Sequence, residues 1–335
     1  VGGAEPINYA VRNAAQDLSG FEGFDEVKSW FAPSTFVPFS LNDSVYALPE
    51  TQTFSLMFYR DDIFEDLGIS PPDTWDELID IIPIIQKNNM NVGIPSVAGS
   101  GDFTNLFSQI YQRGGTLYTA DNRKTLLDSE TAIEAFDYYV SLYTQYKTPV
   151  QYDFVNRFRT GEMPLGFADF SVFNTLEIFA PEIRGMWKFG LMPGTKMPDG
   201  TINRSVACGG SAVMMLKNAK NDSTERNTAA WEFMKWWVSA DTQLRFGTSA
   251  RYTTANLEAF KRLSWSISQM EVLNAQRQWT VGTPEVPGGY YLSRHITNAV
   301  RRMINDKAET RETMLDYSRI INDEITKKRK ELGIE

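Results

Sequence analysis

Cysteine and histidine are nearly missing from this chain of 335 residues, which has one of each. The single cysteine, Cys208, excludes an intramolecular disulfide and any cysteine-based metal cluster. It lies in an apolar, glycine-rich run, so we expect a small buried residue rather than a nucleophile. A catalytic triad would have to pass through His295, and a histidine-based metal site would need more ligands than the chain has. The residues therefore predict no cofactor and no metal.

Basic charge and long apolar runs are also scarce. The formal net charge is -9 and the sequence pI is near 4.9. Because phosphate binding needs a basic face, nucleic acid is not expected as a partner. No segment approaches the roughly 18 uninterrupted apolar residues of a membrane helix. The chain opens on a loop at Val1 without a signal peptide or lipobox, so we expect either a cytosolic protein or a processed piece of a longer one.

The most informative stretch that is present runs from Tyr46 to Leu67. Its middle, Thr53 to Tyr59, is almost continuously apolar or aromatic, as expected for a strand of an α/β sheet covered on both faces. We interpret it as a strand that leaves one lobe for another, with a polar start facing a cleft. The alternative is an ordinary buried strand entered from a loop. A helix follows, with Asp73 or Thr74 as its N-cap.

Other segments alternate between strand and helix patterns. We expect a helix over residues 8–18, a strand over 164–168, and a long strand over 204–216 with glycines midway. Three tryptophans at helical spacing in residues 226–240 are expected to pack in a core. The length suits about two domains.

Polar and aromatic residues recur where loops or strands run into helices. Sugars present ring faces that stack on aromatic side chains and hydroxyls that need paired hydrogen bonds, so a cleft with both residue types suits them. Open α/β sheets place ligands at such junctions. Together these junctions indicate binding more than catalysis. A glycosidase with paired carboxylates stays open, because separations between Asp and Glu side chains are invisible in the sequence.

Several motifs resemble the signature of extracellular solute-binding proteins of the sugar-binding, maltose-binding-like type. They are Val45-Tyr-Ala-Leu-Pro-Glu50, Met57-Phe-Tyr-Arg-Asp-Asp-Ile-Phe64, Pro71-Pro-Asp-Thr-Trp-Asp-Glu-Leu78 and Ala230-Trp-Glu-Phe-Met-Lys-Trp-Trp237. Arg60 and Asp61 stand where the family usually has Asn and Lys. The resemblance covers almost the whole chain.

The resemblance implies a two-lobed α/β fold of the type II periplasmic-binding-protein kind. It places residues 1–54 and 211–253 in an N-terminal lobe, and residues 55–210 and 254–335 in a C-terminal lobe. It also implies a protein without catalytic residues, outside the cell or in the periplasm. Such a protein binds a carbohydrate between the lobes and delivers it to an ABC permease in the membrane.

Carried over by motif, the family's ligand positions fall at both lobes and at the crossings between them. They are Glu5, Asn8, Gln52, Thr53, Asp102, Phe103, Thr104, Asp169, Phe170, Ser171, Gly210, Tyr290, Tyr291 and Arg294. Where the family commonly stacks Trp on the sugar, this chain has Phe170 or Ser171 and Tyr290 or Tyr291.

One departure concerns the start of the chain. Family members begin with two further strand-helix units, so we expect an incomplete first lobe and a missing N-terminal lipoprotein segment that would anchor the protein. We expect a monomer that can associate through that incomplete lobe. The alternatives are a glycoside-acting enzyme and a noncatalytic binding module of a larger surface protein.

Overall fold

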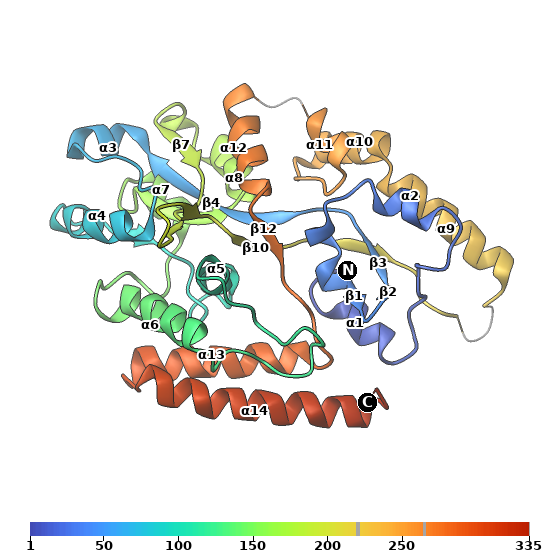
Figure 1. Ribbon diagram of the computed structural model, residues 1–335. Coiled ribbons are helices and arrows are strands. Elements are labelled where there is room, and N and C mark those ends of the chain that lie inside the picture. The colour runs from blue at the N-terminus through green and yellow to red at the C-terminus, as the bar shows by residue number, and fades with distance from the viewer. Residues whose placement is uncertain (219–221, 264–265, 335) are drawn as a thin grey trace.

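The computed structural model describes residues 1–218, 222–263 and 266–334, apart from the side chains of Ile267, Tyr290 and Tyr291. A mixed sheet organises this part of the chain, in the order β12-β10-β4-β6-β5, with β7 also paired to β4 (Figure 1). Its strands are β4 (Thr53–Arg60), β5 (Val92–Gly93), β6 (Leu165–Asp169), β7 (Trp187–Gly190), β10 (Val206–Gly209) and β12 (Thr280–Gly282).

Strand β4 is the centre of the sheet and confirms the strand expected from Thr53 to Tyr59. Its first residues pair with β10, and residues 55–59 pair antiparallel with β6. Residues 57–60 also pair with β7. Leu56 and Phe58 are fully buried while Phe54 and Met57 are 4% exposed, so both faces of the strand are covered.

Helices surround this sheet and share one large apolar core with it, and a short hairpin lies beside α5. They are α3 (Asp61–Leu67), α4 (Trp75–Lys87), α5 (Thr104–Gln112), α6 (Glu130–Thr144), α7 (Phe154–Arg159), α8 (Ser171–Phe179), η3 (Pro181–Ile183), β8 (Thr195–Lys196), β9 (Ile202–Asn203), α12 (Ile267–Arg277), α13 (Gly289–Asn305) and α14 (Thr310–Glu331). The last two helices lie side by side along one edge of the molecule, below α5 and α6 in Figure 1.

A second, smaller lobe has its own apolar core, with Trp231 and Leu48 at its centre. Its elements are α1 (Glu5–Ala10), α2 (Phe24–Lys28), η1 (Pro33–Thr35), η2 (Val37–Phe39), β1 (Ser40–Leu41), β2 (Ser44–Val45), β3 (Ala47–Pro49), β11 (Ala212–Met214), α9 (Thr224–Val238) and α10 (Ala240–Ala250). Helix α11 (Leu257–Lys261) follows α10, and its Phe260 packs in the larger core. Strands β3 and β11 pair antiparallel, and the chain passes between the lobes just after each of β3 and β10 (Figure 1).

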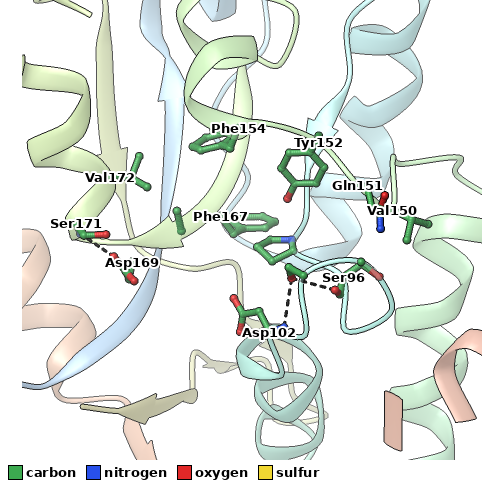
Figure 2. Close-up of a pocket in the computed structure, with 14 residues that line it drawn as sticks. Ser96, Asp102, Val150, Gln151, Tyr152, Phe154, Phe167, Asp169, Ser171 and Val172 are labelled. Atoms are coloured by element: carbon green, nitrogen blue, oxygen red, sulfur yellow. Dashed lines mark hydrogen bonds between the residues drawn. The ribbon is translucent and has the colours of Figure 1, made fainter. Parts of the chain in front are cut away.

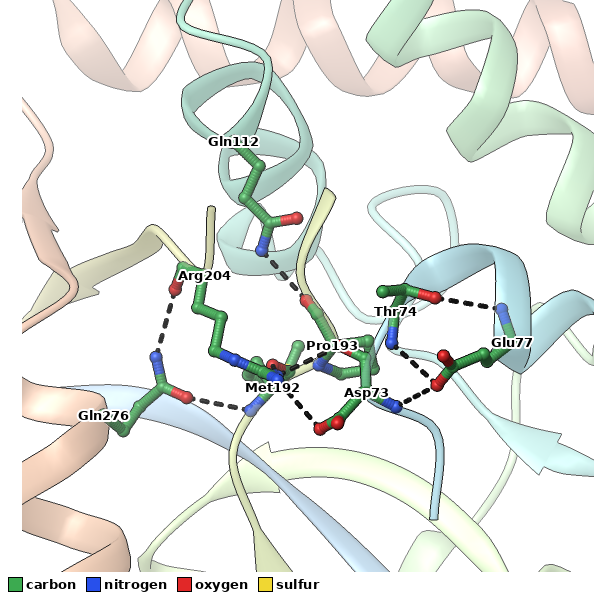
Figure 3. Close-up of polar contacts among 8 residues, drawn as sticks. All are labelled: Asp73, Thr74, Glu77, Gln112, Met192, Pro193, Arg204 and Gln276. Carbon is green, nitrogen blue, oxygen red and sulfur yellow. Dashed lines mark hydrogen bonds and ion pairs between the residues drawn. The ribbon is translucent and has the colours of Figure 1, made fainter. Parts of the chain in front are cut away.

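The start of α4 confirms that Thr74 is an N-cap. Its hydroxyl accepts from the Glu77 amide, and the Glu77 carboxylate accepts from the Thr74 amide, which forms a capping box. Asp73 instead pairs with Arg204, whose Nη1 also donates to the Met192 carbonyl (Figure 3). The helix start is thereby tied to the loop after β7.

Three expectations were wrong in detail. The helix expected over residues 8–18 is α1, which ends at Ala10, because Asn13 takes a left-handed φ of 55° and the chain turns to bridge the segment after β11. The long strand over 204–216 is broken into β10 and β11 at Gly210. Trp231 is buried as expected, but Trp236 is 56% exposed, because it lies on the solvent face of α9.

Cys208 is buried in β10, as expected, and burial raises the pKa of its thiol. Within the described residues, no helix has the length and apolar character needed to cross a membrane. The same part of the chain contains no group of three or more His, Cys, Asp or Glu side chains arranged to hold a metal ion.

Candidate functional site

A cavity of about 320 Å³ lies at one edge of the main sheet, in the larger lobe (Figure 2). Strands β5 and β6 run parallel, so the segments that follow them leave the sheet at the same edge. Those segments, together with the loop before α7, supply the lining. It consists of Pro95, Ser96, Gly99, Ser100, Asp102, Val150, Gln151, Tyr152, Phe154, Phe167, Ala168, Asp169, Ser171 and Val172.

The same local motif occurs twice at this cavity, as Asp102-Phe-Thr104 and Asp169-Phe-Ser171. In each, the aspartate accepts a hydrogen bond from the amide two residues ahead, at 2.8 Å for Asp102 and 2.7 Å for Asp169. Thr104 and Ser171 are the first residues of α5 and α8, so each carboxylate satisfies a free amide at a helix N-terminus. One oxygen of each carboxylate is used in this way, which leaves the other for the cavity.

The phenylalanine of each motif packs into the protein instead of facing the cavity. Phe170 is only 4% exposed, and its ring stacks on Phe173 with centroids 5.0 Å apart. Phe103 stacks on Phe107 at 5.3 Å and packs against the core. Neither lines the cavity, whose aromatic surface comes from Tyr152, Phe154 and Phe167 instead. Phe170 therefore offers no ring face to a ligand in this structure.

Two hydroxyl groups of the lining are buried. Ser96 is 1% exposed, and its Oγ lies beside the hydroxyls of Tyr139 and Tyr143. The Tyr152 hydroxyl is also buried and unpartnered, and Figure 2 shows it on the side of the ring that faces the other lining residues. Burial raises the pKa of Tyr152, so its hydroxyl stays protonated and able to donate. Buried polar groups are almost always paired, so the Tyr152 hydroxyl indicates a place for a ligand or water.

Of the expected ligand positions, the structure brings three to this cavity: Asp102, Asp169 and Ser171. Phe103 and Thr104 lie beside it at the start of α5. Glu5 is exposed at the start of α1, Asn8 lies on the same helix, and Arg294 is exposed on α13. The side chains of Tyr290 and Tyr291 lie outside the described residues.

The remaining expected positions lie at the crossing between the lobes. Gln52 is 1% exposed, and its amide nitrogen donates to Thr280 Oγ1 at 3.1 Å. Thr53 is exposed at the start of β4, opposite Gly209. A Cβ on Gly210 would come within 2.0 Å of the Thr51 carbonyl oxygen, so glycine is required there by close backbone packing. Gln52 and Gly210 thus hold the crossing together rather than line the cavity.

Sequence reasoning missed Ser96, Gln151 and Tyr152. All three lie in loops without a distinctive pattern, and Gln151 and Tyr152 follow a helix that gave only a core signal. The parallel pairing of β5 with β6 would have placed the loop of Ser96 at the same edge as Asp169, whereas the loop of Gln151 and Tyr152 follows neither strand and reaches the cavity through tertiary packing.

Comparisons with known proteins agree with this architecture. Residues 3–269 match the family model described as bacterial extracellular solute-binding protein. A putative binding protein of Brucella abortus is 23% identical over 315 residues, which cover 90% of this chain and 73% of the relative.

Two solved structures share the fold. The sugar-binding protein MalE of Xanthomonas citri superposes with a TM-score of 0.83 at 16% identity, over 100% of this chain and 85% of that one. An ABC transporter solute-binding protein of Thermotoga lettingae, bound with α-D-tagatose, has a TM-score of 0.76 at 20% identity, over 96% and 83%. The fold is therefore the two-lobed type II fold of periplasmic binding proteins. By its sequence, the chain belongs to the bacterial extracellular solute-binding protein family.

Proposed function

We propose that this protein is the solute-binding component of an ABC transporter and holds a mono- or oligosaccharide in the cavity at the edge of β5 and β6. The observation that carries the proposal is the composition of the lining. It combines aromatic surface from Tyr152, Phe154 and Phe167 with the unpartnered Tyr152 hydroxyl and two carboxylates that each have a free oxygen. Sugars need both kinds of contact at once.

The similar structures support the same class of ligand, since one is named a sugar-binding protein and another holds α-D-tagatose. The mechanism we propose is closure of the lobes. Residues 1–54 with 211–253 form one lobe, and residues 55–210 with 254–335 form the other. A ligand favours the closed state only by contacting both. Glu5, Asn8 and Thr53 are our candidates for contacts made on closure, after which a membrane permease receives the sugar. Arg294 belongs to the same lobe as the cavity and lies outside its lining.

A thermal-shift panel of mono- and oligosaccharides tests the proposal. A ligand at 100 times its Kd stabilises the folded state by about 2.7 kcal/mol, which raises the melting temperature measurably. We expect one group of related sugars to do so, and Asp169→Asn to weaken the response. Asp80→Asn, on the exposed face of α4, is the matched control. If no saccharide stabilises the protein, the carbohydrate assignment is wrong.

Two carboxylates in one cavity are also a feature of glycosidases. We propose binding without hydrolysis, because one oxygen of Asp102 and one oxygen of Asp169 each accept a hydrogen bond from a helix-start amide, which gives both carboxyl groups a structural role. Incubation with chromogenic glycosides of the sugars that bind should release no chromophore. If the wild-type protein releases the chromophore and neither Asp102→Asn nor Asp169→Asn does, the protein is an enzyme instead.

A further inference from the structure

The cavity lining carries charge of one sign. Asp102 and Asp169 belong to it, whereas none of its residues is Lys, Arg or His. Arg301 on α13 donates to the Ala98 carbonyl at 3.3 Å, so it contacts the same loop, but it is not part of the lining.

The helix ends reduce this negative charge without cancelling it. Helices α5 and α8 both begin at the cavity, and each N-terminus is equivalent to roughly half a positive charge. Two carboxylates outweigh two such ends by roughly one negative charge. The amide two residues beyond each aspartate is already bonded to its carboxylate, so it is not free for an anionic ligand.

The deeper lining is neutral. The Tyr152 hydroxyl is buried and unpartnered, and Ser96, which is 1% exposed, lies beside the hydroxyls of Tyr139 and Tyr143. A neutral hydroxyl can both donate and accept a hydrogen bond, so these groups suit the hydroxyls of a sugar. Neither supplies the charged donor that a buried carboxylate or phosphate needs.

We infer that this site selects saccharides without negative charge, taking neutral or amino sugars and rejecting uronic acids and sugar phosphates. The inference rests on the proposed function and adds the charge class of the ligand. An anionic group in this cavity would meet like charge from Asp102, which is half-buried, and from Asp169, which is exposed. An ammonium group could instead donate hydrogen bonds to the free oxygens of the two carboxylates.

Titration of matched sugar series tests the inference. We would measure affinities for the neutral sugar, the 2-amino sugar and the uronate of the gluco, galacto and manno series, at low salt and below neutral pH, where the amine is protonated. In the series that binds, we expect the uronate to bind about ten-fold more weakly or worse than the neutral sugar, which is about 1.4 kcal/mol. Added salt should reduce this difference in affinity between the uronate and the neutral sugar, which we call the gap.

Two variants show whether the carboxylates cause the gap. Asp102→Asn and Asp169→Asn keep the shape and an acceptor oxygen, so each should narrow the gap between uronate and neutral sugar. Asp80→Asn on α4 removes the same charge away from the lining and should leave it unchanged.

A uronate or sugar phosphate that binds as tightly as its neutral counterpart overturns the charge selection and leaves the carbohydrate assignment intact. A gap that persists in both Asp→Asn variants also overturns it. Absence of binding by every saccharide overturns the proposed function, and this inference with it.

Discussion

At the scale of single residues, the Tyr152 hydroxyl separates ligand binding from stability. It has no partner in the protein, so Tyr152→Phe should leave the free energy of unfolding nearly unchanged while it weakens sugar binding. One neutral hydrogen bond is worth about 0.5–1.5 kcal/mol, so we expect a loss of affinity between about two-fold and about ten-fold by calorimetry.

Tyr139→Phe is the opposite case, because that hydroxyl accepts from the Val97 amide and donates to the Pro95 carbonyl. It should lower stability. If Tyr152→Phe destabilises the protein as much as Tyr139→Phe does, the Tyr152 hydroxyl is structural.

Two adjacent glycines at the lobe crossing give a second test at this scale. In Gly210→Ala the new Cβ would lie 2.0 Å from the Thr51 carbonyl oxygen, so the strands at the crossing must move apart. We expect a loss of about 2 kcal/mol or more in urea unfolding. In Gly209→Ala the nearest atom is Thr53 Oγ1 at 3.9 Å, so the change should stay within about 0.5 kcal/mol. Equal losses in both variants would contradict this explanation.

At the scale of elements, Gln112 joins α4, α5 and the loops around β8 and β9. Its Oε1 accepts from Trp75 Nε1 at 2.7 Å and from Thr195 Oγ1 at 3.0 Å. Its Nε2 donates to the carbonyls of Pro193 and Ser205, the first of which is visible in Figure 3. Every polar atom of this buried amide is therefore paired.

Gln112→Leu should remove all four bonds and leave buried donors and acceptors unpaired, at a cost of about 3 kcal/mol or more. Gln109, one turn earlier on α5, is equally buried, but its Nε2 has no partner. Gln109→Leu should therefore cost clearly less in chemical unfolding. A larger loss for Gln109→Leu would show that Gln112 does not hold these elements together.

At the scale of the whole molecule, Glu285 connects folding to pH. Its carboxylate lies against Gly289 at the start of α13, near Ala4 of the smaller lobe, and close to Tyr111 and Tyr118. Burial raises the pKa of Glu285 from 4.5 to about 7. Between these values the folded state keeps a proton that the unfolded state has lost.

Stability should therefore fall as pH rises from about 4.5 to about 7, by up to about 3 kcal/mol, because one pKa unit is worth about 1.4 kcal/mol. In Glu285→Gln this fall should disappear, which urea unfolding at a series of pH values measures. Glu134→Gln, exposed on α6, should retain the fall. A wild-type stability that is flat or rising over this range would contradict the prediction.

Local patterns predicted much of the fold. The apolar run from Thr53 to Tyr59 identified β4, and the Thr74 cap with Glu77 marked the start of α4, because both depend on neighbours in the sequence. The motif resemblance predicted the two-lobed fold. Local patterns did not predict where an element ends when tertiary contacts end it. Examples are α1 and the expected long strand that is broken at Gly210.

By itself, the sequence determined the central strand and the two aspartates at helix starts, since these are short-range patterns, and its motifs were enough to indicate the class of fold and the family by resemblance. Only the tertiary structure decided which residues share a cavity. Parallel pairing of β5 with β6 brings Asp102 and Asp169 to one edge together with Ser96, and packing of the loop before α7 adds Tyr152. Packing also turned Phe170 into the core, because a ring orientation depends on neighbours that are distant in the chain.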